Sequence, residues 1–562
     1  MTLLLDKPRL AFLSIVGCIC LFWTTDSVSG TQQISTDPFT NPSSQHMTEV
    51  EPHIFANGAT IVATFQQGRF FGGGGSDIGF STSIDNGATW HPGSLPGLTE
   101  FAGGVHQAVS DPAVAYNAAF GLWLIETLPL GGSPSIAVSR SSDGLSWDNP
   151  ITVWTGDDSS FFDKPWIACD NTPSSPSFGN CYIEWDDVFQ GGVILMSTST
   201  DGGSSWAAPV AAPDTAGLGG QPLVQPSGRV VVPYRSFDGN IQSFVSDDGG
   251  LSWSASVTIA GLSGHQVAGD LRAVALPSAA IDGNGKIYVA WSDCRFHPSC
   301  DANDIVISTS SDGLTWSDVT AVPIDPSTST ADYFTPGLGA DRNTVAPNVG
   351  LALVYYYYPQ ADCSPTTCQL TGGFITSQNG GSRWSAPIDV TRRMSNDWLA
   401  DTSQGRMAAD YLGAYYTDDG VPHPVFAGAV PPTDQFLESM FSTCADCPAS
   451  AISQAEEGQA APAAPQASAQ KAPAARPSTE GVGFRVVAPT YQVNIGTFIR
   501  LATAGAANQD AAVQWSVEEG PSGGQVSNSG VYKAPLSPGV YHVAADNGFE
   551  RAQVEIQVFT VR

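Results

Sequence analysis

Positive charge is scarce in this chain of 562 residues. Lys and Arg number 22 against 53 Asp and Glu, which gives a formal net charge of −31. Because long-range repulsion opposes binding to nucleic acid and to anionic membrane surfaces, we do not expect either as a partner. The chain is also longer than a single hydrophobic core requires, so we expect two or more domains.

Apolar sequence of membrane-spanning length is also lacking near the N-terminus. The run Leu10–Trp23 has about 14 residues, whereas a spanning helix needs about 20. It follows Lys7 and Arg9 and precedes the small, polar stretch Thr24–Gly30. This pattern predicts a signal peptide over residues 1–30 and a secreted, extracellular protein that is not integral to a membrane after processing. Lipoprotein anchoring at Cys18 on the cell surface is the alternative.

Paired zinc-type cysteine knuckles are lacking too. Cys444 and Cys447 have the two-residue spacing of such a knuckle, but no second knuckle accompanies them. Apart from Cys18 and Cys20, the cysteines fall into close pairs, which in an exported chain predict small-loop disulfides. The predicted disulfides are Cys169/Cys181, Cys294/Cys300, Cys363/Cys368 and Cys444/Cys447.

What the sequence does contain is one short phrase in six copies, Ser-x-Asp-(x)-Gly-x-Ser/Thr-Trp. Strand-like sequence precedes each copy, and this spacing indicates a radial repeat of β-sheets. The carboxylate caps its own turn, glycine supplies a positive φ, and the tryptophan packs between neighbouring sheets. Each phrase therefore predicts a structural hairpin lock and not a catalytic site. The copies end at Trp90, Trp147, Trp206, Trp253, Trp316 and, in a degraded copy, Trp384.

These phrases resemble the Asp-box, or BNR repeat, and residues 46–445 resemble the sialidase-like family of Asp-box β-propellers. The resemblance implies an all-β fold with a propeller over residues 31–448. Six boxed units and one unboxed unit that begins near Asp410 predict seven blades, with six blades as the alternative. A strand within residues 33–50 would close the ring.

The composition changes after the predicted propeller. Residues 449–481 are dominated by Ala, Pro, Gln and Ser, which predicts a disordered linker. An alternating pattern returns over residues 482–562, where Val513–Val517 and Gly530–Pro535 resemble bacterial immunoglobulin-like modules. This resemblance implies a small β-sandwich that acts as a spacer or adhesive module.

Candidate site residues stand at X-Pro steps that open the predicted blades. Innermost strands of a propeller line its axial channel, and acidic groups at one channel mouth raise each other's pKa. Such a group suits a general acid beside a carboxylate base, or a metal ion with oxygen ligands, whereas a simple turn cap is the structural alternative. The resulting candidates are Asp111, Asp163 and Asp410 for catalysis and Glu51 and Lys164 for substrate binding.

Basic side chains near predicted strand ends form a second group of candidates. Three converging guanidinium groups would clamp a carboxylate, because each offers a planar fork of donors. The same residues could equally be ordinary charges on the rim. The arginines in this position are Arg69, Arg235, Arg272, Arg295 and Arg406, of which Arg235, Arg272 and Arg295 are the candidate substrate-binding residues.

The family resemblance implies cleavage of terminal sialic acid by a tyrosine nucleophile with a glutamate partner, an aspartate acid/base and three arginines. Asp77, on the glycine-rich loop Gly72–Asp77, matches the acid/base. Tyr411 or one of Tyr355–Tyr358 matches the nucleophile. Where the family has an arginine at the start of blade one, this chain has Glu51-Pro52-His53-Ile54, and a carboxylate there would repel the sugar's carboxylate.

Two classes of function follow. The first is a secreted glycoside hydrolase with two channel-mouth carboxylates, exo-sialidase-like or diverged. The alternative is a non-catalytic glycan- or protein-binding adhesion protein of the cell surface. Tryptophans outside the boxes, such as Trp123 and Trp154, favour a carbohydrate or glycoconjugate partner. We expect no required cofactor and leave a structural calcium ion, the sugar, the linkage and the oligomeric state open.

Overall fold

The computed structural model describes residues 30–157 and 159–443 and, in the C-terminal part, 485–487, 492–494, 498–504, 513–527, 530–535, 537–546 and 551–559. The chain is all-β over this part, and its described helices are short 3-10 turns: η1 (Glu100–Ala102), η2 (Val188–Gln190), η3 (Pro298–Cys300), η4 (Asn396–Trp398) and η5 (Gly520–Gly523). No described helix has the length and apolar character needed to cross a membrane. The predicted signal peptide, the linker and the Cys444/Cys447 pair lie outside the described residues.

Antiparallel hairpins of successive strands build the first two units, which share one sheet because Gly75 pairs with Val109. The alternation of apolar and small polar residues along these strands places both faces of the sheet in contact with neighbours. The strands are β2 (Glu49–Asn57), β3 (Thr60–Arg69), β4 (Gly75–Ser83), β5 (His91–Ser94), β6 (Ala108–Asn117), β7 (Leu122–Leu130), β8 (Ser135–Ser141) and β9 (Ile151–Thr155).

Four further sheets repeat the same antiparallel plan. The first two contain β10 (Phe162–Cys169), β11 (Cys181–Asp187), β12 (Val193–Ser199) and β13 (Val210–Ala211), then β14 (Gly217–Leu218), β15 (Leu223–Val224), β16 (Val230–Ser236), β17 (Asn240–Ser246) and β18 (Val257–Gly261). The next two contain β19 (Ser278–Ile281), β20 (Ile287–Asp293), β21 (Asp304–Ser310) and β22 (Thr320–Ala321), then β23 (Asp332–Ala340), β24 (Leu351–Tyr358), β25 (Gln369–Ser377), β26 (Ile388–Asp389) and β27 (Met394–Ser395).

The last sheet of this body joins both ends of its sequence. Strand β1 (Thr31–Gln33) pairs with β32 (Glu438–Thr443), beside β31 (Pro422–Ala429) and β30 (Gly413–Tyr416). A small hairpin of β28 (Ala400–Thr402) and β29 (Gly405–Met407) precedes it. The predicted closing strand thus pairs at residues 31–33, slightly before the predicted segment.

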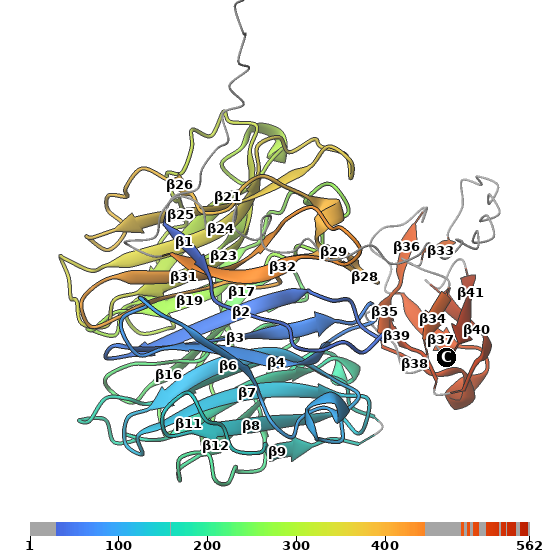
Figure 1. The fold of residues 1–562 in the computed structure, drawn as a ribbon, viewed down its shortest axis with the longest axis horizontal. Coiled ribbons are helices and arrows are strands. Elements are labelled where there is room, and N and C mark those ends of the chain that lie inside the picture. Colours follow the sequence, from blue (N-terminus) through green and yellow to red (C-terminus); the bar gives the residue numbers. More distant parts are fainter. Residues whose placement is uncertain are drawn as a thin grey trace, which may run out of the picture.

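The first strands of successive units pack against one another. In order, β2 contacts β6, followed by β10, β15, β19, β23 and β30, and β30 contacts β2 again. A narrow cavity of about 80 Å³ lies among these strands, and residues of each of them line it, from His53 on β2 to Tyr415 on β30. This arrangement is a β-propeller-type fold (Figure 1).

The repeated phrases form the predicted hairpin locks. In the first copy, Asp85 accepts hydrogen bonds from the backbone N–H and the hydroxyl of Thr89, at 2.9 and 2.7 Å. The indole Nε1 of Trp90 donates to the carbonyl of Gly87, whose φ of +80° favours glycine. In the degraded copy, Asn379 takes the carboxylate's place and accepts from the N–H of Arg383 at 2.7 Å.

Three of the four predicted disulfides are present, Cys169–Cys181, Cys294–Cys300 and Cys363–Cys368. Cys169 and Cys181 are cross-strand partners on β10 and β11, so this bond fastens the first hairpin of its sheet. The other two close short surface loops.

The C-terminal residues form a separate group of strands (Figure 1) around a core that includes Tyr532, Val543 and Ile556. Its resemblance to immunoglobulin-like modules stays a prediction. The strands are β33 (Arg485–Val487), β34 (Gln492–Asn494), β35 (Phe498–Arg500), β36 (Ala502–Ala504), β37 (Gln514–Val517), β38 (Gln525–Val526), β39 (Val531–Lys533), β40 (Gly539–Asp546) and β41 (Arg551–Phe559).

Candidate active site

Four first strands carry the same irregularity, a β-bulge at an X-Pro step. The residue before proline has a positive φ in each: Glu51 (57°), Asp111 (46°), Lys164 (47°) and Thr335 (48°). The pairing register shifts at the same points in β2, β6, β10 and β23. A positive φ is unfavourable for residues other than glycine, and the residue before proline normally prefers extended backbone. Bulges of this kind re-aim side chains, and three of these four meet near the axis.

Lys164 lies at the centre of this meeting point. Its Nζ lies 3.0 Å from Oε1 of Glu51, 2.8 Å from Oδ1 of Asp111 and 2.7 Å from Oδ2 of Asp410. All four side chains are almost fully buried. Although burial opposes its charge, the three carboxyl groups raise the pKa of Lys164 well above its usual value. The ammonium group is therefore a permanent positive charge inside the protein.

Arg272 completes the charge balance. Its Nε donates to Oδ1 of Asp410 at 2.8 Å, and its Nη2 donates to Oδ2, so the pair is bidentate. Against the effect of burial, Arg272 and Lys164 hold the pKa of Asp410 well below its usual range. Burial, together with Asp111 and Asp410, raises the pKa of Glu51 to about 8 despite Lys164. Two basic groups, Lys164 and Arg272, thus lie among the three carboxyl groups of Glu51, Asp111 and Asp410.

An open cleft of about 480 Å³ reaches this cluster. The charged residues that line it are Asp111, Asp163, Arg69, Arg272 and Lys533. Arg69 is buried, and its Nη1 donates to Gln66 Oε1 and to the carbonyl of Gly74. The cleft lining thus combines carboxyl and guanidinium groups, of which Asp163 and Arg272 are partly exposed and Asp111 and Arg69 almost fully buried.

The walls of the cleft are aromatic and glycine-rich. Phe70 and Phe71 lie on one wall next to Gly72, Gly73 and Gly74, and Phe71 is 40% exposed. Gly73 has a φ of 140° and no atom near the position of an added Cβ, so the loop leaves open space above the cleft. Gln404, at the tip of the β28–β29 hairpin, and Lys533, on β39 of the C-terminal part, also line the cleft.

Asp163 has the properties of a proton donor near neutral pH. It is half-buried and lines the cleft. Burial, with a smaller contribution from the charge of Asp111, raises the pKa of Asp163 to about 6, although Lys164 opposes the shift. A carboxyl group with a pKa in this range keeps a proton that it can donate in the mildly acidic to neutral range.

Buried carboxyl groups on the second strands were not among the predicted residues. Glu126 on β7 and Glu184 and Asp186 on β11 are completely buried, and none of their carboxyl oxygens has a hydrogen-bond partner among the described residues. Burial raises the pKa of each well above its usual value. The signal in the sequence was the presence of Glu184, Asp186 and Asp187 after the apolar start of the segment Cys181–Asp187.

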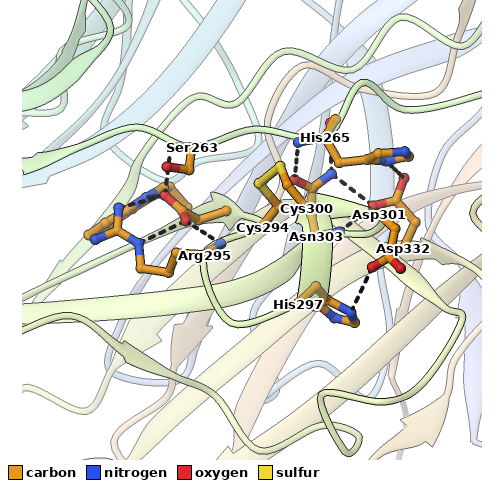
Figure 2. The surroundings of a disulfide bond; sticks show 11 residues. Ser263, His265, Cys294, Arg295, His297, Cys300, Asp301, Asn303 and Asp332 are labelled. Carbon is orange, nitrogen blue, oxygen red and sulfur yellow. Dashed lines mark hydrogen bonds and ion pairs between the residues drawn. A yellow bond between two sulfur atoms is a disulfide. The ribbon is translucent and has the colours of Figure 1, made fainter.

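The structure brings seven of the ten predicted site residues together and places three elsewhere. Asp77 is buried on β4 opposite Gln67 and does not line the cleft. Arg235 lies on β16 in another sheet. Arg295 folds back on Asp293, to which its Nε and Nη2 donate at 2.8 and 2.7 Å; Figure 2 shows it on one side of the Cys294–Cys300 disulfide, with the His265–Asp332 pair on the other.

Neither candidate for a tyrosine nucleophile is open to the cleft. Tyr411 is 5% exposed, its hydroxyl donates to the carbonyl of Pro112, and burial together with Glu51 raises its pKa well above the usual value. Tyr355–Tyr358 lie on β24, within a different sheet. A buried phenol that resists ionisation is a poor nucleophile, so the geometry does not favour these tyrosines for that role.

No group of three or more His, Cys, Asp or Glu side chains among the described residues is arranged to hold a metal ion. In the cluster around Lys164, ammonium and guanidinium groups occupy the place that a metal ion would take between the carboxylates.

Comparison with known proteins identifies a BNR repeat-like domain over residues 174–348, which agrees with the repeated phrases. A search of curated proteins finds no match. Among solved structures, a protein of unknown function from Dyadobacter fermentans has 16% identity and a TM-score of 0.40, over 62% of this chain and 98% of that chain. The Hadza microbial sialidase Hz136 has 19% identity and a TM-score of 0.38, and the similarity covers 57% of this chain and 65% of that chain. NanB sialidase from Streptococcus pneumoniae has 15% identity and a TM-score of 0.36, and the similarity covers 73% of this chain and 70% of that chain. Similarities this low carry no argument about the reaction.

Proposed function

We propose that this chain is a secreted glycoside hydrolase whose active site is the cleft lined by Asp111 and Asp163. The observation that carries the proposal is the unequal environment of two carboxyl groups in one cleft. Asp111 is paired with the buried ammonium of Lys164, whose Nζ lies 2.8 Å from its Oδ1. Asp163 has its pKa raised to about 6, so it holds a proton at a higher pH than an ordinary aspartate does. Pairs of carboxyl groups whose environments differ in this way divide the roles of acid and anion in glycoside hydrolysis.

The two carboxyl groups take different roles in the proposed reaction. Asp163 donates its proton to the oxygen of the leaving group as the glycosidic bond breaks. Asp111 either stabilises the positive charge that develops on the sugar ring or forms a covalent bond to the ring as a nucleophile. The exposed face of Phe71 offers an apolar platform for the sugar, and Arg69 and Arg272 orient its polar groups.

The proposed architecture is a closed seven-bladed propeller. In support, the β1–β32 pairing fastens the last sheet to the N-terminal strand, and β30 packs against β2. In such a ring the bulged ends of the first strands gather at one mouth of the axial channel, where the cleft lies. We also propose that the C-terminal module forms part of the active site, because Lys533 lines the cleft.

The proposal is tested by incubating the protein with a panel of fluorogenic glycosides, sialosides included. We expect turnover of at least one of them and a loss of about 100- to 10,000-fold in the Asp111→Asn variant. Asp301→Asn is the matched control, since that carboxyl group is 69% exposed and distant in sequence from the cleft lining. Full activity in folded Asp111→Asn would exclude this cleft. Glycan binding without any turnover would support the non-catalytic alternative.

A further inference from the structure

Asp186 lies directly behind the proposed acid. It is the cross-strand partner of Asp163, on β11 opposite β10. Side chains of directly opposite residues stand on the same face of a sheet with their Cβ atoms about 4.5–5.5 Å apart. Asp163 lines the cleft, whereas Asp186 has no exposed surface. The two carboxyl groups therefore form one pair, in which Asp163 is the outer member at the cleft and Asp186 is the inner, fully buried member.

The described residues around Asp186 compensate a charge on it only weakly. Neither of its carboxyl oxygens has a hydrogen-bond partner among the described residues. The acids that face it are Asp163, Glu184 and Asp111. Lys164 is the cation that faces it, and its ammonium group is already bound to Glu51, Asp111 and Asp410. A buried carboxyl group in this position takes up a proton in preference to remaining an isolated anion.

The outer member is better compensated. Asp163 faces the cations Lys164 and Arg272 as well as the anions Asp111 and Asp410, and its Oδ1 accepts the backbone N–H of Lys164 at 3.0 Å. Burial and the charge of Asp163 raise the pKa of Asp186 well above its usual value, and burial raises that of Asp163 to about 6. Two coupled carboxyl groups lose their protons in two separate steps that belong to the pair.

We propose that Asp186 and Asp163 share one proton at neutral pH, and that Asp186 is the positioning residue that keeps this proton available to Asp163. The inference rests on the proposed function, in which Asp163 is the acid. The proton passes from Asp163 to the glycosidic oxygen, which also keeps the electron pair of the breaking C–O bond. The attacking water then gives up a proton to Asp163 and restores the pair, so water is added across the bond.

The pH dependence of kcat/KM on the best glycoside of the panel tests the pair. Asp186→Asn removes the titrating partner and retains its shape. We expect the alkaline limb of the profile to move at least one pH unit lower, with at least tenfold loss at pH 7 and a much smaller loss at pH 5. Asp77→Asn is the matched control, because it removes an equally buried carboxyl group, on β4 opposite Gln67, that does not line the cleft. An unmoved limb, or an equal loss at all pH values, would overturn the proposal.

Proton uptake on folding gives a second test of the Asp163–Asp186 pair that needs no substrate. Urea unfolding of the full chain between pH 5 and 7 reports how many more protons the native state binds than the unfolded state. We expect Asp186→Asn to reduce this number by about one. The effect of Asp186→Asn should also differ in an Asp163→Asn background, because coupled sites are not additive. An unchanged proton number contradicts the pair whether or not a glycoside is hydrolysed; a reduced number without turnover refutes the proposed function and retains the pair.

Discussion

Nζ of Lys164 and Oδ2 of Asp410 lie 2.7 Å apart, although the two residues come from opposite halves of the chain. Arg272 holds the same carboxylate from a third segment. This contact joins the bulged strand β10 to the segment before β30. It therefore helps to hold in place the end of β10 that carries the cleft residue Asp163. The charge network is therefore structural support for the two cleft carboxyl groups as well as their electrostatic environment.

Replacement of Lys164 by methionine should strongly destabilise the protein. The change leaves Asp111 and Glu51 buried without their cation and Asp410 with Arg272 alone. Removing one partner of a buried ion pair costs about 3–5 kcal/mol. Urea unfolding at pH 7 measures the loss. Lys286→Met is the control, since Lys286 contacts the ring of Tyr288 at 5.1 Å, a contact worth about 0.5–1 kcal/mol. Equal losses in both variants would contradict the assigned role of Lys164.

Stability should fall as the pH rises above the acidic range. Burial raises the pKa of Glu49 to about 8, while Ser35 and the N–H of Met440 donate to its Oε2. A carboxyl group whose folded pKa is raised stabilises the fold below its unfolded pKa of 4.5, and this contribution is lost as the pH approaches 8. Glu49→Gln should make the fall in the free energy of unfolding less steep by about 1.4 kcal/mol per pH unit. Urea unfolding at pH 5, 6 and 7 measures the slope, and an unchanged slope would show that Glu49 is ionised in the native state.

The Asp-box carboxylates should matter for stability and not for turnover. Asp85→Ala removes the acceptor for the N–H and hydroxyl of Thr89 and for Ser83. We expect a loss of about 1–2 kcal/mol and unchanged kcat. Thermal unfolding and a glycosidase assay on the same preparation test both parts. A large loss of kcat without a loss of stability would assign this box a catalytic role.

Lys533 should affect substrate binding more than chemistry. It lines the cleft from the C-terminal part, remote from Asp111 and Asp163 in sequence. Lys533→Ala should raise KM severalfold and leave kcat nearly unchanged, because a wall residue contributes to uniform binding. Arg551→Ala is the control, since Arg551 is exposed and bound to Glu518. An unchanged KM would mean that the module does not contact the substrate.

The sequence was most informative where local chemistry and geometry coincide. The boxes are built from contacts within a few residues, as between Asp85 and Thr89, and their form could be predicted. The X-Pro steps also marked Glu51, Asp111 and Lys164, because in these three units a proline after an acidic or basic residue interrupts the strand. That these steps are bulges with positive φ emerged only from the paired strands.

Contacts between distant segments could not be predicted in the same way. Asp186 depends on its cross-strand partner Asp163 and on complete burial, neither of which the alternation of the strand indicates. Lys533 depends on how the C-terminal part lies against the cleft. For Arg295 the deciding contact is local. Its partner Asp293 stands two residues earlier in the sequence and binds the guanidinium group, which is therefore not available to a substrate.

The most direct measurement compares Asp163→Asn on two glycosides with the same sugar, one with a natural sugar leaving group and one with a dinitrophenyl leaving group. If Asp163 is the proton donor, the variant loses about 100- to 10,000-fold in kcat/KM on the natural glycoside, whose leaving oxygen needs a proton. It keeps most of its activity on the dinitrophenyl glycoside, whose leaving group departs without one. Equal losses on both substrates, or none on either, would contradict the assignment of the acid and with it the proposed active site.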